Sequence, residues 1–171
     1  CPSGTSLTGW TAISGATASS YDPPTGLTTS RSYAVFVSPV AGVGSVVCGE
    51  AQWAPVCRNV IVLPAVVYGT LATGNQSITY PADPASIAFS TASSGGAGTF
   101  TYQWYYQAGI IAAPTGGTTT GWTLIQGATL NAYDPPSGLT ASRSYACLVT
   151  PGGSPLCGSA TWASGVRQIT V

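Results

Sequence analysis

The sequence predicts an all-β chain that holds about one and a half copies of a single β-sandwich module. Residues 1–39 match residues 113–151 at a constant offset, with roughly 24 of the 39 positions identical. After a three-residue difference in one loop, residues 48–62 match residues 157–171. Short runs of alternating apolar and polar residues, separated by turn residues, fill the rest of the chain. Such spacing is typical of strands joined by turns, whereas helical periodicity is not evident.

The repeat predicts two unequal parts, because nothing in residues 1–63 matches residues 65–112. We expect residues 64–171 to form a complete module and residues 1–63 to form the C-terminal half of another. Alone, that half would expose an apolar sheet face and unpaired strand edges, which folded proteins avoid. We therefore expect it to be completed by strands from outside this chain. They would come from preceding residues of a longer protein, or from another chain by β-augmentation.

Seven strands are expected in the complete module. The proline-rich segment 81–84 must interrupt strand pairing, and the glycine-rich segment 93–98 is expected to be a loop. The strongest strand has its aromatic residues on one face, in the order Phe100, Tyr102, Trp104 and Tyr106. The predicted strands are 66–71, 77–80, 86–90, 99–107, 122–125, 143–150 and 158–171, the last kinked near Ser164-Gly165. Seven strands at this spacing predict an immunoglobulin-like sandwich.

Three aromatic residues are predicted to lie in the core. Trp104 stands in the middle of a strand, like the buried tryptophan of the third immunoglobulin strand, and Tyr145 precedes Cys147 by two residues, as in the sixth. Tyr33 is the counterpart of Tyr145 in the first copy. The usual second-strand cysteine is missing, so hydrophobic burial must replace the inter-sheet disulfide.

Several motifs together resemble the Ig-like tandem repeats of very large secreted surface proteins of Bacteroidota-type bacteria. They are Gly-Thr-Phe-Thr-Tyr-Gln-Trp, Gly-Trp-Thr-Leu-Ile-Gln-Gly-Ala-Thr and Tyr-Asp-Pro-Pro-Ser-Gly-Leu-Thr-Ala-Ser-Arg-Ser-Tyr, all within residues 95–149. The resemblance implies an extracellular, cell-surface chain whose partners are neighbouring modules of the same protein or fibre. It departs from the family pattern at Thr79, where many relatives have a cysteine. The pairing known from those relatives therefore does not apply to Cys157.

Five cysteines in a chain with so few charges favour an oxidising, extracellular compartment. Cys147 and Cys157 lie on opposite arms of one predicted hairpin, and we expect a disulfide between them. Cys48 lacks a counterpart of Cys147 in its own copy, so its partner is either Cys57 or Cys1. There is no histidine and no Cys-x-x-Cys spacing, so a zinc site is not expected.

The charged residues are 5% of the chain, where about 25% is usual. Such a chain cannot form the basic groove that nucleic-acid binding requires. No apolar run reaches the roughly 18–20 residues of a membrane span. Without histidine or lysine, the residues for general acid–base chemistry are scarce, and no base is present to activate serine or threonine. We expect neither an enzyme nor a cofactor.

Two acid–base pairs recur at the same nine-residue separation, Asp22 with Arg31 and Asp134 with Arg143. Their repetition predicts a structural ion pair that joins a turn to the next strand. Calcium binding and ligand contact are the alternatives, although calcium usually gathers several carboxylates.

Three further aromatic residues are candidates for ligand contact. Tyr105 lies on the strand face opposite Trp104, and Trp122 and its counterpart Trp10 border a loop. Such rings stack on sugars or pack at module junctions. The sequence thus favours a structural or adhesive repeat of an extracellular stalk, filament or sheath that assembles laterally. The alternatives are a carbohydrate-binding accessory module and a virion decoration domain.

Overall fold

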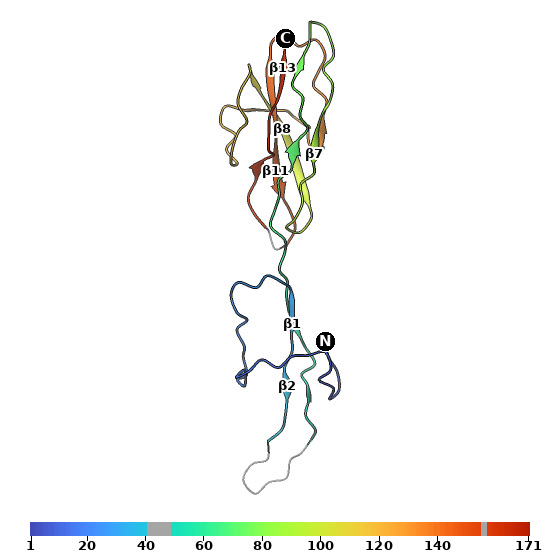
Figure 1. The fold of residues 1–171 in the computed structure, drawn as a ribbon, viewed down its shortest axis with the longest axis vertical. Coiled ribbons are helices and arrows are strands. Elements are labelled where there is room, and N and C mark those ends of the chain that lie inside the picture. The colour runs from blue at the N-terminus through green and yellow to red at the C-terminus, as the bar shows by residue number, and fades with distance from the viewer. Residues whose placement is uncertain (41–48, 155–156) are drawn as a thin grey trace. The chain divides into compact units, whose positions relative to one another are not determined.

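The computed structural model describes residues 1–40, 49–154 and 157–171, and these residues form strands and turns without a helix (Figure 1). They divide into two compact units, Cys1–Val62 and Leu63–Val171. We call these the smaller and the larger unit. The division falls one residue before the predicted boundary between residues 63 and 64. The all-β prediction is confirmed.

The larger unit contains two sheets, as expected for a β-sandwich. The first has the order β10-β7-β5, and the second has the order β6-β13-β11-β8-β9, with β12 also paired to β11. Figure 1 shows β8, β11 and β13 running side by side. The strands are β5 (Thr70–Leu71), β6 (Gln76–Ser77), β7 (Ile87–Thr91), β8 (Phe100–Ala108), β9 (Thr123–Leu124), β10 (Ala132–Tyr133), β11 (Arg143–Pro151), β12 (Thr161–Trp162) and β13 (Arg167–Thr170).

The pairing of β8 with β11 forms the centre of this unit. Nine residue pairs join the two strands without interruption, from Arg143 opposite Ala108 to Pro151 opposite Phe100. Because side chains alternate between the faces of a strand, Trp104 and the opposite Cys147 both face the first sheet. The predicted aromatic face of residues 100–106 packs against the buried cluster.

The core of the larger unit is fully enclosed around Trp104 and Tyr145, both of which are 0% exposed. The Trp104 ring lies 5.8 Å from that of Tyr133, and its Nε1–H donates to the Leu130 carbonyl at 2.8 Å. The Trp104 ring is thus surrounded by apolar groups, and its single N–H donor has a hydrogen-bond partner. The prediction that Trp104 and Tyr145 are core residues is confirmed.

The smaller unit has two short antiparallel pairs of strands. They are β1 (Arg31–Tyr33) with β4 (Arg58–Val60), and β2 (Phe36–Val37) with β3 (Gln52–Trp53). These pairs have the same register as β11–β13 and β11–β12 in the larger unit. In the smaller unit, the pairs are Arg31↔Val60, Ser32↔Asn59, Tyr33↔Arg58, Phe36↔Trp53 and Val37↔Gln52. The corresponding pairs of the larger unit, in the same order, are Arg143↔Ile169, Ser144↔Gln168, Tyr145↔Arg167, Leu148↔Trp162 and Val149↔Thr161.

Candidate functional site

The two units share a frame of aromatic rings as well as strand registers. Trp10 and Trp53 lie with ring centroids 5.2 Å apart, and their counterparts Trp122 and Trp162 lie 5.4 Å apart. The Nε1–H of Trp53 donates to the Ser6 carbonyl at 2.8 Å, and that of Trp162 donates to Thr118 at 3.0 Å. In both units, the tryptophan pair and this hydrogen bond therefore hold the loop that contains Ser6 or Thr118 against the outer face of the sheet.

A second ring pair is also repeated. Tyr21 and Tyr33 have centroids 5.6 Å apart, the same distance as between Tyr133 and Tyr145. Tyr33 is nevertheless only half-buried, whereas Tyr145 is completely enclosed. The prediction that Tyr33 is a core residue is thus met only in part. The reason is that Tyr106 on β8 lies opposite Tyr145, and the described residues of the smaller unit include no strand in that place.

Among its described residues, the smaller unit has no counterparts of β5, β7 and β8, and apolar side chains that these strands cover in the larger unit are exposed. Val35 is 53% exposed, and its counterpart Cys147 is 0% exposed. Val37 is 54% exposed, and its counterpart Val149 is 0% exposed. In the larger unit, these two positions lie opposite Trp104 and Tyr102 in the register of β11 with β8. The same strand face is therefore covered in one unit and open in the other.

A groove of about 720 Å³ is lined by residues 9–13, Tyr21 and residues 31–33, the last of which precede Val35 in the chain. By the repeat, residues 11–12 correspond to β9, and residues 31–33 correspond to the first part of β11. In the larger unit these two segments are the pairing partners of Tyr105, Tyr106 and Ala108 on β8. The groove is thus the place that the second half of β8 occupies in the larger unit, and it is the candidate site.

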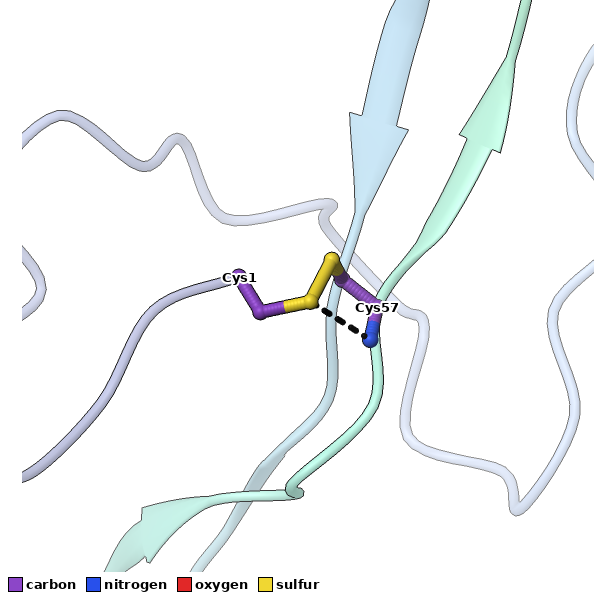
Figure 2. The surroundings of a disulfide bond; sticks show 2 residues. All are labelled: Cys1 and Cys57. Atoms are coloured by element: carbon purple, nitrogen blue, oxygen red, sulfur yellow. Dashed lines mark hydrogen bonds between the residues drawn. A yellow bond between two sulfur atoms is a disulfide. The ribbon is translucent and has the colours of Figure 1, made fainter.

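One disulfide joins Cys1 to Cys57, with the two Cα atoms 5.3 Å apart (Figure 2). The Cys57 N–H donates to Cys1 Sγ at 3.2 Å. The bridge fixes the start of the chain beside β4. Sequence reasoning considered both residues only as partners of Cys48, so this pairing was missed. Cys48 lies outside the described residues, and its predicted bonds to Cys57 or Cys1 are wrong because those two are bonded to each other.

The predicted Cys147–Cys157 disulfide is also wrong, because Cys147 is a free thiol. Strand alternation on β11 directs Cys147 into the core opposite Trp104, where its thiol donates weakly to the Leu148 carbonyl at 3.7 Å. Cys157 lies instead beside the 93–98 loop, close to Gly96. Desolvation by burial raises the pKa of Cys147 to about 12.

The predicted ion pairs do not form. All four residues are described, and no salt bridge joins Asp22 to Arg31 or Asp134 to Arg143. Both aspartates are exposed on their turns, where an ion pair would gain little over hydration. Arg143 instead places its guanidinium carbon 4.5 Å from the centroid of the Tyr106 ring. This cation–π contact holds the start of β11 against β8.

The rings predicted to face a ligand pack against other rings. Tyr105 contacts Trp162 edge-on at 5.2 Å, and Trp162, which is only 4% exposed, also contacts Trp122. Trp10 packs against Trp53 in the same way. Tyr105, Trp122 and Trp10 are each half-buried. Their main contacts are therefore with the protein itself.

Comparison with protein-family models, with curated proteins and with solved structures finds no match to this chain. Within the described ranges, no three His, Cys, Asp or Glu residues gather in a way that could hold a metal ion. The same ranges include no helix long and apolar enough to span a membrane. The internal comparison of the two units is thus the guide to function.

Proposed function

We propose that this chain is a non-catalytic structural repeat of an extracellular stalk, filament or sheath, made of immunoglobulin-like modules. The observation that carries the proposal is the duplicated frame: the same ring pairs and strand registers occur twice in one chain. Internal duplication at this scale is typical of proteins that use a module for its shape and contacts rather than for a single active centre. The partners are neighbouring modules of the same kind.

The chemistry of the chain supports an extracellular setting and a role without catalysis. Disulfides persist in oxidising compartments, and the Cys1–Cys57 bridge is compatible with one. The sequence contains no histidine or lysine and only four acidic residues. General acid–base catalysis needs such groups close to one another in a site.

Immunogold labelling of the source cells tests the proposed location and arrangement. An antibody raised against this chain should label intact cells, with gold particles following extended structures outside the envelope. Antibody absorbed beforehand with the purified chain is the control and should leave the cells unlabelled. Labelling that appears only after the cells are permeabilised would contradict the proposal.

Carbohydrate binding is a second candidate, favoured by the half-buried rings of Tyr105 and Trp122, which lie on either side of the buried Trp162. Aromatic faces can stack on sugar rings. A glycan array probed with the wild-type chain and with Tyr105→Ala tests this function. Tyr80→Ala, which changes a tyrosine that is 66% exposed, is the matched control. The candidate requires binding that Tyr105→Ala abolishes and Tyr80→Ala preserves.

A further inference from the structure

We propose that the groove of the smaller unit binds an extended β-strand that has an aromatic residue at every second position, with tryptophan at its centre. The occupant is an uncharged strand of the β8 type that lies outside residues 1–171. This inference deepens the proposed function and rests on it, since it names the groove as the contact between neighbouring repeats.

The strand edge is the first support. In the larger unit, β11 pairs with β13 on one edge and with β8 on the other. In the smaller unit, β1 pairs with β4 on the corresponding first edge. Among the residues that the structure describes, no strand pairs with the second edge of β1. Its backbone groups are thus available to an added strand, which is the basis of β-augmentation.

The backbone groups across the groove are the second support. In the larger unit, the Trp104 N–H donates to the Ala128 carbonyl and the Trp104 carbonyl accepts from the Ile125 N–H, both at 3.0 Å. The counterparts of these two partners are Ala16 and Ile13. The turn that holds them is the same in both units, because Ala16 N–H donates to Ile13 at 3.2 Å and Ala128 N–H donates to Ile125 at 3.2 Å. The smaller unit therefore presents the same donor and acceptor to an incoming tryptophan.

Apolar complementarity is the third support, and it sets the register. Trp104 lies opposite Cys147 and Tyr102 lies opposite Val149. Through the repeat, a bound strand would place its tryptophan opposite Val35 and the aromatic residue two positions earlier opposite Val37. Burial of the two exposed valines and of these rings would drive the binding. A shift by one residue would turn the aromatic residues to the other face, so the register is strongly specified.

The chemistry of the groove selects an uncharged partner. Arg31 is the only charged residue in its lining. β8 itself, with the sequence Phe-Thr-Tyr-Gln-Trp-Tyr-Tyr-Gln-Ala, carries no charge. The β8 strand of a second folded copy is not the occupant, because all nine of its residues already pair with β11.

Titration of a labelled peptide with the full 171-residue chain tests the proposal. The peptide has the sequence of residues 98–109 with fluorescein at its N-terminus, and binding is followed by fluorescence anisotropy. We expect saturable binding. Val35→Asp in the chain should weaken it at least tenfold, because a carboxylate would face the tryptophan. Val40→Asp, at a valine that is 90% exposed, is the matched control and should change affinity less than twofold.

Variants of the peptide test the register. Trp104→Ser in the peptide should weaken binding at least tenfold, and Thr101→Ala, on the opposite strand face, less than twofold. Circular dichroism of the Val35→Asp chain should match that of the wild type, since Val35 is already half exposed; the peptide variants need no folding control.

The absence of saturable binding would overturn the proposal, as would equal losses from Val35→Asp and Val40→Asp. Sedimentation gives a further decisive outcome. A chain that dimerises through this face, with Val35→Asp abolishing the dimer and peptide failing to compete, would assign the groove to self-association. None of these results affects the immunogold test, and labelling confined to the cell interior would leave peptide binding unaffected. Failures of the two proposals are thus distinguishable.

Discussion

Tyr33 and Tyr145 occupy the same position in two copies of one sequence, and they differ in what covers them. Each contacts a second tyrosine at 5.6 Å and each lies in a strand with the same antiparallel register. One is half-buried and the other is enclosed. The comparison teaches that the local frame of turns, rings and strand pairs is encoded within about 60 residues of each copy. The enclosed core depends on the strands of residues 64–112, which only one copy has.

The largest effect is expected from removing the ring at the centre of that core. Trp104→Ala should lower the free energy of unfolding of the larger unit by about 3–5 kcal/mol, because it creates a cavity and leaves the Leu130 carbonyl without its donor. Urea denaturation followed by far-ultraviolet circular dichroism measures this. Trp122→Ala removes a half-buried ring of the same kind and should cost clearly less. Equal losses from the two variants would contradict the central role of β8.

The disulfide offers a similar test within the smaller unit. Cys1→Ser should destabilise that unit by about 4 kcal/mol, since the bond closes a loop with a sequence separation of 56 residues. Guanidinium denaturation should show the unfolding transition of the larger unit unchanged. Under reducing conditions, the wild type and the variant should behave alike, and a difference that persists there would point to packing rather than to the bond.

The buried thiol predicts a loss of stability in alkaline solution. Its pKa is about 12 in the folded chain and near 9.0 when unfolded, so its stabilising effect is complete below pH 9 and declines as the pH rises toward 12. At pH 10 this thiol should account for a loss on the order of 1 kcal/mol relative to pH 8. Burial raises the pKa of Tyr133 and Tyr145 in the same direction.

Cys147→Ala separates the contribution of the thiol from that of the tyrosines. The variant should show a shallower decline of unfolding free energy between pH 8 and 10, measured by urea denaturation at each pH. The raised pKa values of Tyr133 and Tyr145 should contribute to the slope that remains. A slope equal to that of the wild type would show that Cys147 ionises in the folded state as readily as in the unfolded state.

The smallest effects are expected at the recurring charges. Asp22→Asn and Asp134→Asn should each move the midpoint of thermal unfolding by less than about 2 °C, because neither carboxylate has an ion-pair partner. Arg143→Ala should cost about 0.5–1 kcal/mol through the lost contact with Tyr106. Differential scanning calorimetry measures all three. A large effect of Asp134→Asn would restore the ion-pair interpretation.

The two long strands of the larger unit were predictable because alternation and turn residues act locally. The described residues of this unit form nine strands where seven were expected, since β10 was not predicted and residues 158–171 contain both β12 and β13. Residues 99–107 and 143–150 were expected as strands, and β8 and β11 extend one residue beyond them at most. The kink expected near Ser164 falls between β12 and β13. These are features that a few neighbouring residues determine, so the sequence pattern was sufficient.

Contacts between distant residues were not predictable in the same way. Five cysteines allow several pairings, and spacing alone does not show that Cys1 reaches Cys57. The nine-residue recurrence of aspartate and arginine reflects duplication of the sequence, which repeats every residue of a turn whether or not it makes a contact. The groove beside Tyr33 emerged only from comparison of the exposed fractions of equivalent side chains.

The Cys1–Cys57 bond also determines how the chain would respond to tension. A pulling force applied at residue 1 passes through the two sulfur atoms directly into β4 and on toward residue 63. The residues between the two cysteines are shielded from that load and cannot be drawn out while the bond is intact. Reduction would release them, lengthening the stretched chain by about 190 Å at roughly 3.4 Å per residue. The redox state of this one cysteine pair thus sets the extensibility of the segment.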